Sequence, residues 1–171
     1  MRVLVTFASR HGATAGIAEA IAAVLRDTVD DDPSHVVEVL PADDVDAVED
    51  YDAVIIGSAV YLGRWLLPAR ALVRHNAAAL SDRPVWLFSS GPVGDPAVPA
   101  QDASDVPALA DLVGARGSRT FSGRLRLAEL SRAERTAIRG VHVAEGDYRD
   151  WVEIRSWAED VADSLAPSPR P

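Results

Sequence analysis

The sequence predicts an α/β fold in which a parallel β-sheet is covered by helices on both faces. Short apolar runs rich in β-branched residues alternate along the chain with segments that carry apolar residues at helical spacing. The apolar runs are continuous rather than alternating with polar residues, which is typical of strands buried on both faces. Strands that alternate with helices form βαβ units, and these units build a parallel sheet.

The first third of the chain predicts three strands and one helix. Residues 2–8 (RVLVTFA) form an apolar run that we expect to be a buried strand. Residues 13–26 (ATAGIAEAIAAVLR) then place their large apolar side chains at helical spacing. After a break at DDDPSH, residues 36–40 (VVEVL) predict a second strand. The acidic connector 41–51 is expected to lie in water with a half-turn of helix, and residues 52–60 (DAVIIGSAV) predict a third buried strand.

The middle of the chain continues the alternation. Residues 66–80 (LLPARALVRHNAAAL) predict one helix, with a proline in its first turn, where proline is tolerated. Residues 83–90 (RPVWLFSS) predict a fourth strand. The proline-rich stretch 91–107 is long for an ordinary loop, and long loops are often functional. Residues 108–117 (ALADLVGARG) predict a short helix that ends at glycine, and residues 118–125 (SRTFSGRL) predict a fifth strand.

The last segment predicts a closing helix within 147–165, which ends a single domain that we expect to span residues 1–166. One face of this helix carries Trp151, Ile154, Trp157, Val161 and Leu165. The remaining residues, 167–171, are expected to be a disordered tail.

Composition excludes several classes of function. The formal net charge is −9, with a pI near 4.8, which argues against a nucleic-acid partner. All 17 basic residues are arginine, and the absence of cysteine excludes disulfides, thiolate metal sites and a cysteine nucleophile. No stretch approaches the ~20 apolar residues of a membrane span, so we expect a cytoplasmic protein. No catalytic side chain and no metal site stand out.

The loop after the first strand, residues 9–14 (SRHGAT, the first loop), predicts a phosphate site. A helix that starts directly after a strand leaves backbone N–H groups without helical partners, and with the helix dipole these attract an anion. Gly12 permits close approach, and Ser9 and Thr14 add hydroxyl groups. GxxxxGK[ST] and GxGxxG are both absent, so a terminal phosphate monoester fits best. The alternative is that these residues only cap the helix.

Two further loops follow buried strands at the same edge of the predicted sheet, where ligands of such folds bind. In the second loop, residues 57–65 (GSAVYLGRW), small residues let a planar group approach, and Tyr61 and Trp65 offer aromatic faces. The alternative is that either ring packs on the following helix. The third loop, residues 89–96 (SSGPVGDP), supplies hydroxyl groups and accessible amides.

These three loops resemble those of the flavodoxin family. The resemblance implies a three-layer sandwich with a five-stranded parallel sheet in the order 2-1-3-4-5, and FMN as the cofactor. It places Ser9, His11, Gly12, Ala13 and Thr14 around the phosphate, with Arg10 exposed beside them. The imidazole of His11 then either donates to the phosphate or points to solvent. The flavin ring would lie between Ser58, Ala59, Tyr61, Leu62 and Gly63 on one side and Ser89, Ser90, Gly91 and Gly94 on the other.

Within this family, the strings TFASRHGAT, YDAVIIGSAVYLGRW, FSGRLRL and DYRDWVEIRSWAEDVADSL are similar to the FMN-dependent, quinone-linked protoporphyrinogen oxidase branch. SRAE (131–134) predicts a capping box that opens a short helix. An arginine island surrounds it, formed by Arg124, Arg126, Arg132, Arg135 and Arg139. We expect the island to bind a porphyrin-like substrate, a redox partner or, through residues 124–139, a lipid headgroup. The alternative is a solvated helix face with Arg–Glu pairs.

Three functions remain open from the sequence. The first is an FMN-dependent oxidoreductase that passes electrons from a bulky substrate to a quinone, with Trp65, Arg124 and Arg126 facing the substrate. The second is a flavodoxin-type single-electron carrier that docks on a redox partner. The third is a flavin-free domain that uses the fold for protein contacts.

Overall fold

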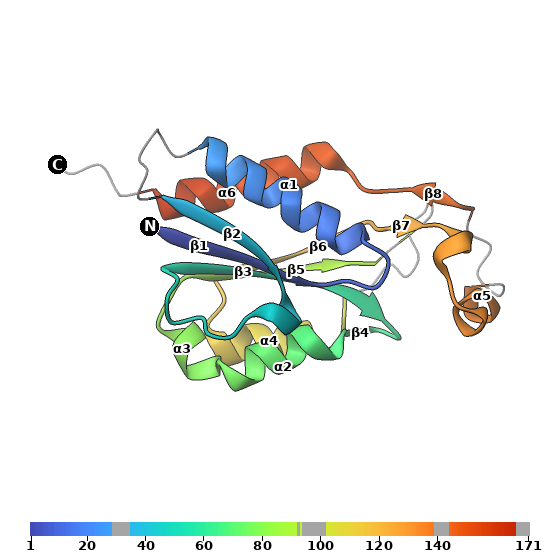
Figure 1. Ribbon diagram of the computed structural model, residues 1–171, viewed down its shortest axis with the longest axis horizontal. Helices are drawn as coiled ribbons and strands as arrows, with labels where there is room; N and C mark the ends of the chain where they lie inside the picture. The colour runs from blue at the N-terminus through green and yellow to red at the C-terminus, as the bar shows by residue number, and fades with distance from the viewer. Residues whose placement is uncertain (29–34, 92, 94–101, 139–143, 167–171) are drawn as a thin grey trace.

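The computed structural model describes residues 1–28, 35–91, 93, 102–138 and 144–166 (Figure 1). Within these residues, five parallel strands form the central sheet in the order β2-β1-β3-β5-β6. Counted along the chain, this is the predicted order 2-1-3-4-5, so the expected fold is confirmed. A short strand, β4, pairs antiparallel with the end of β3. The strands are β1 (Arg2–Ala8), β2 (Val36–Pro41), β3 (Ala53–Tyr61), β4 (Arg64–Trp65), β5 (Val85–Ser90) and β6 (Gly117–Phe121).

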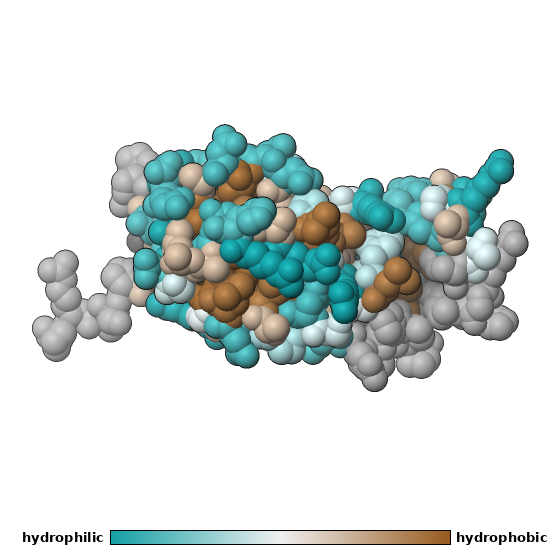
Figure 2. Space-filling model, turned by 90° about the horizontal axis from the view of Figure 1, so that it is seen from below, coloured by the Kyte–Doolittle hydropathy of each residue, from teal (hydrophilic) through white to brown (hydrophobic). Residues whose placement is uncertain are grey.

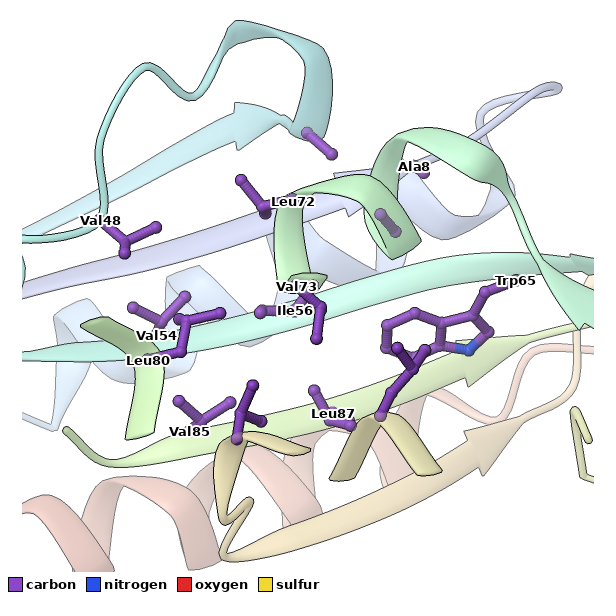
Figure 3. Close-up of a cluster of buried hydrophobic side chains, with 14 of the residues drawn as sticks. Ala8, Val48, Val54, Ile56, Trp65, Leu72, Val73, Leu80, Val85 and Leu87 are labelled. Carbon is purple, nitrogen blue, oxygen red and sulfur yellow. The ribbon is translucent and has the colours of Figure 1, made fainter. Parts of the chain in front are cut away.

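Helices cover both faces of the sheet (Figure 1). One face is covered by α1 (Ala13–Asp27) and α6 (Trp151–Leu165), and the other by α2 (Leu67–His75), α3 (Ala77–Ser81) and α4 (Val106–Val113). Because the central strands β1, β3 and β5 bury apolar side chains on both faces, two hydrophobic cores form, one under each helical layer. Figure 3 shows the core on the α2–α4 side. The acidic connector contains one short 3-10 helix, η1 (Ala42–Asp44), as expected.

The closing helix, α6, buries the predicted apolar face, and a side chain caps its N-terminus. Ile154 and Val161 are fully buried, and the other three predicted residues pack against the same core. The carboxylate of Asp150 accepts hydrogen bonds from the N–H groups of Val152 (2.9 Å) and Glu153 (3.0 Å). Such a cap contributes about 1 kcal/mol to helix stability. The predicted tail, residues 167–171, lies outside the described residues.

Two predicted elements are divided in the structure. The helix expected over 66–80 is interrupted at Asn76, whose side-chain amide and backbone N–H both donate to the carbonyl of Leu72, at 2.9 and 3.1 Å. Local hydrogen bonding of this kind competes with continuation of the helix. The strand expected over 118–125 leaves the sheet after Phe121. Its end becomes β7 (Arg124–Leu125), which pairs antiparallel with β8 (Gly146–Asp147).

Beyond the carboxyl ends of the sheet strands lies a small outer unit (Figure 1). Residues 124–138, here called the strap, run through β7, η2 (Leu127–Glu129) and α5 (Arg132–Ile138). The predicted capping box is confirmed at the start of α5. The N–H of Ser131 donates to Glu134 Oε2 at 2.8 Å, and the N–H of Glu134 donates to Ser131 Oγ at 3.3 Å.

The outer face of the α2–α4 layer is mainly hydrophilic. Figure 2 shows teal side chains that surround separate brown patches on this face. Leu67 of α2 and Leu112 of α4 are among the exposed large apolar residues. Among the described helices, none has the length and apolar character needed to cross a membrane.

Candidate functional site

The first loop turns the chain from β1 into α1 with a backbone that favours glycine. Gly12 has a φ of +75°, in the left-handed region, and occupies the N-cap position of α1. Its N–H donates to Ser9 Oγ at 3.1 Å, and its carbonyl accepts from Gly16 N–H at 3.0 Å. Within the described part of the chain no side chain caps α1, and its first turn carries no acidic residue. The N–H groups of this turn are therefore free to bind an anion.

All six residues predicted for the phosphate lie together in this turn. Ser9 and His11 are partly buried, Arg10 and Gly12 are exposed, and Thr14 is buried within the first turn of α1. The loop thus combines accessible N–H groups with two nearby hydroxyl groups, which suits the chemistry of a phosphate monoester.

Glu134 of the strap joins the first loop, and the sequence did not single it out for that role. Its Oε1 lies 3.1 Å from Arg10 Nη1 and 3.2 Å from His11 Nε2. The Arg10 guanidinium lies over the Tyr61 ring, with Cζ 4.7 Å from the centroid. The His11 ring faces Glu134, so it does not point to solvent, and its Nε2 is already in contact with a carboxylate. The sequence marked Glu134 only as part of a capping box, and nothing in that local motif indicates a contact with His11, 123 residues away in the chain.

The electrostatics of this cluster favour an ionised Glu134 and a neutral Tyr61. Hydrogen bonds from Ser131, followed by those from His11 and Arg10, lower the pKa of Glu134 from 4.5 to about 2. Burial first, and then the nearby charge of Glu134, raise the pKa of Tyr61 to about 12. Both groups keep these states throughout the neutral pH range.

The second loop is a tight hairpin between β3 and β4. Leu62 and Gly63 have φ values of +51° and +72°, and the Leu62 side chain is fully exposed. Ser58 is buried, and its hydroxyl donates to the carbonyl of Ala59 (2.8 Å) and accepts from Leu66 N–H (2.9 Å). Its hydroxyl therefore holds the loop rather than facing a ligand, whereas Tyr61 stays partly exposed beside the first loop.

Trp65 does not offer an aromatic face to a substrate, contrary to the expectation from the sequence. Its side chain is only 2% exposed and lies within the core on the α2–α4 side (Figure 3). Its indole N–H donates to Ser89 Oγ at 2.8 Å. The alternative stated for this residue was packing on the following helix, and Trp65 does lie in one buried cluster with Ala69 and Leu72 of α2.

The third loop is described only at its start. Ser89 and Ser90 are buried at the end of β5, and Gly91 N–H donates to the carbonyl of Phe121 at 3.3 Å. Ser89 and Ser90 are thus paired within the sheet and do not face a ligand site. Gly91 is partly exposed beside the second loop, near Val60. The predicted ligand residue Gly94 lies outside the described residues.

The arginine island is mostly tied to protein groups. Arg124 is 17% exposed and donates to the carbonyl of His11 at 2.8 Å, so it does not face an open substrate site as expected. Arg126 is 59% exposed and pairs with Glu129 at 3.4 Å. Arg135 Nε donates to the carbonyl of Leu130 at 3.1 Å. Arg132 is exposed, and Arg139 lies outside the described residues. Arg–Glu pairing, the alternative stated for this segment, accounts for part of it.

Glu134→Gln is expected to loosen the strap. Its ionised carboxylate makes short contacts with the loop and with the capping box, and hydrogen bonds to charged groups contribute about 1.5–3 kcal/mol. We expect amide protons of α5 to exchange roughly tenfold faster at pH 7 in the variant. Glu129→Gln is the control, because Glu129 makes only the longer contacts of 3.3–3.4 Å with arginines. Equal exchange in the wild type and Glu134→Gln would contradict a docking role.

The same comparison has an expected pH dependence. The pKa of Glu134 is lower in the folded chain, about 2, than its ordinary value of 4.5. The ionised carboxylate therefore stabilises the docked strap above pH 4.5, and this stabilisation is lost as the pH falls toward 2. Exchange rates of the wild type and Glu134→Gln should converge over that range. A difference that persisted unchanged at pH 2 would contradict the assigned charge state.

Comparison with known proteins gives one family match and three similar solved structures. The flavodoxin domain matches residues 4–151. A flavodoxin from the domain Archaea matches with a TM-score of 0.65 and 17% identity over 96% of this chain and 99% of that one. Oxidised flavodoxin 1 from Bacillus cereus matches with a TM-score of 0.60 and 14% identity over 97% and 100% of the two chains. The rubredoxin:oxygen oxidoreductase of Desulfovibrio gigas matches with a TM-score of 0.63 and 12% identity over 96% of this chain and 36% of that one.

No curated protein matches the chain in sequence. At these low identities the structural matches establish the fold. Among the described residues, no group of three or more His, Asp or Glu side chains could hold a metal ion. The uncapped turn at Gly12 and the family match both support FMN as the cofactor. The match covers most of the chain, and the chain belongs to the flavodoxin domain family.

Proposed function

We propose that this chain is an FMN-binding electron carrier of the flavodoxin type. The observation that carries the proposal is the first turn of α1, which starts at a left-handed glycine with no side-chain cap and no acidic residue. A phosphate dianion would complete the hydrogen bonding of this turn and would interact favourably with the helix dipole.

Each loop has a separate task in this proposal. The N–H groups of the first turn of α1, with Ser9 and Thr14, hold the phosphate. Tyr61, Leu62 and Gly63 flank one side of the flavin ring, and the start of the third loop, at Gly91, flanks the other. When bound, FMN supplies the electron-transfer chemistry, and the chain binds it, orients it and limits its contact with water.

Two observations favour a carrier over an enzyme. Trp65 is in the core and Arg124 is bonded to His11, so two of the three residues expected to face a substrate do not form an open substrate site. The matches to the archaeal flavodoxin and to Bacillus cereus flavodoxin 1 cover 99% and 100% of those chains, so no large part of these two folds lacks a counterpart here.

Cofactor titration tests the proposal. The purified protein, stripped of any bound flavin, is titrated with FMN, FAD and riboflavin while flavin fluorescence and visible absorbance are recorded. We expect one FMN per chain, with weaker binding of riboflavin because it lacks the phosphate. A chain that takes up no FMN would overturn the proposal and favour a flavin-free domain that makes protein contacts.

A second candidate is an FMN-dependent oxidoreductase similar to protoporphyrinogen oxidases. The observation that favours it is Arg126, whose guanidinium stays 59% exposed on the strap next to the first loop, where it could pair with a substrate carboxylate. Steady-state oxidation of protoporphyrinogen with menadione as acceptor separates the two candidates. A carrier shows no turnover, whereas an enzyme shows turnover that Arg126→Gln weakens through a higher KM.

A further inference from the structure

Arg124 links the strap to the first loop. We propose that Arg124 is a positioning residue that makes the site select phosphorylated flavin over unphosphorylated flavin. The proposal rests on the proposed function, because it assigns a role within the same site. Arg124 would act through its hold on the first loop and through its charge at the start of α1.

The contacts of Arg124 place its guanidinium at the loop backbone. Nη2 donates to the carbonyl of His11 at 2.8 Å, between residues 113 positions apart in the chain. A Cβ added to Gly12 would lie 3.8 Å from the same nitrogen, so the guanidinium lies against the N-cap of α1. The β7–β8 pairing holds Arg124 in place, and Tyr148 N–H donates to the carbonyl of Gly123 at 3.0 Å. The arginine is therefore held by a fixed ribbon rather than by a free chain end.

Arg124 pairs with Glu129, a carboxylate that Arg126 also contacts, so Arg124 does not have this negative charge to itself. Two basic side chains of the loop, Arg10 and His11, contact the same carboxylate oxygen of Glu134. Arg149 is bound to Asp147. The contacts of Arg124 with Glu129 are 3.3 and 3.4 Å, longer than the 2.7–2.9 Å typical of strong charge-assisted hydrogen bonds.

The position of this charge also points to an anion. The N-terminal end of a helix carries partial positive charge, so a guanidinium beside it is unfavourable when no negative group lies near. Arg124 lies at this end of α1, which has no acidic residue in its first turn, and the contact with Glu129 at 3.3 Å offsets only part of the repulsion. A phosphate at the first loop would remove this repulsion and would interact with both the helix end and the guanidinium.

Arg124 should therefore affect how the site binds the phosphate of FMN and not how it binds the flavin ring. The residues proposed for the flavin ring lie in the second and third loops, whereas Arg124 contacts the first loop. Loss of its charge should therefore weaken the binding of FMN but not that of riboflavin, which has the same ring without the phosphate. A residue that only stabilised the fold would weaken both to the same degree.

The test compares the dissociation constants of FMN and riboflavin for the wild type and Arg124→Gln by fluorescence titration at fixed salt. We expect FMN to bind roughly tenfold more weakly to the variant and riboflavin to change by less than about twofold. Arg119→Gln is the matched control. It also removes one guanidinium that pairs with a glutamate, Glu153 at 3.0 Å, but from the exposed surface of β6, and it should leave both constants unchanged.

The outcomes separate this inference from the proposed function. If the wild type binds no FMN, the proposed function fails. If the wild type binds FMN and Arg124→Gln binds it equally well, or loses FMN and riboflavin equally, the inference is overturned and the function stands. If Arg124→Gln does not fold, as judged by circular dichroism, Arg124→Met replaces it because it keeps the aliphatic stem. Failure of both variants to fold would also overturn the inference, since the guanidinium would then be a structural residue.

Discussion

The double replacement Gly12→Val and Thr14→Ala is expected to weaken FMN binding at least tenfold, equivalent to about 1.4 kcal/mol. Gly12 adopts a φ of +75°, and a β-branched residue in this region is strained by about 1–2 kcal/mol. The loop would relieve that strain by turning its N–H groups away from their present directions. Loss of the Thr14 hydroxyl removes a further donor from the first turn of α1. Fluorescence titration with FMN measures the change.

The matched control is Gly114→Val. Gly114 also has a left-handed backbone, with a φ of +60°, and nothing lies within 4 Å of the position where its side chain would start, whereas at Gly12 Arg124 Nη2 lies 3.8 Å from that position. It ends α4, far along the chain from the first loop. The control should lower thermal stability and leave FMN affinity unchanged. Unchanged affinity in the Gly12 and Thr14 double variant would mean that the first loop is only a helix cap.

Gly57→Ala is expected to lower the free energy of unfolding by about 3 kcal/mol or more. Gly57 lies in the centre of β3, between Phe7 of β1 and Phe88 of β5. A Cβ at this position would lie 2.0 Å from Cζ of Phe88. The Phe88 ring is fully buried and is enclosed by Phe121 and Trp157, with centroids 6.2 and 6.3 Å away, so it has little room to move. Urea unfolding followed by circular dichroism measures the loss.

A smaller partner side chain at position 88 should restore part of this loss. Phe88→Leu removes the atoms nearest to the added methyl group, so the double variant should be more stable than the sum of the two single losses predicts. Gly117→Ala is the control in the same sheet, because its Cβ would lie at an ordinary 3.5 Å from Trp86 and should change stability little. Strict additivity of the two changes would show that Gly57 and Phe88 are not coupled.

Local pattern was sufficient for most of the fold and for the first loop. The three central strands, β1, β3 and β5, are mainly buried, apolar runs, and α1 and α6 carry apolar faces that pack on one side of them, so a layered sheet is expected from burial. The edge strands β2 and β6 are more exposed and more polar. The loop between β1 and α1 was recognised from small and polar residues at a strand–helix junction, which are local requirements of backbone geometry. The break at Asn76 was missed because a short side-chain hydrogen bond decides it within an otherwise helical pattern.

The sequence by itself determined the alternation of strands and helices, the position of the strand-to-helix turn at Gly12 and the capping box at Ser131 and Glu134. These depend on residues close together in the chain. Only the tertiary structure decided that Trp65 enters the core, that Glu134 meets Arg10 and His11, and that Arg124 reaches the first loop. These contacts join segments as much as 124 residues apart. Their partners are set by the packing of the sheet, which no local spacing of residues reveals.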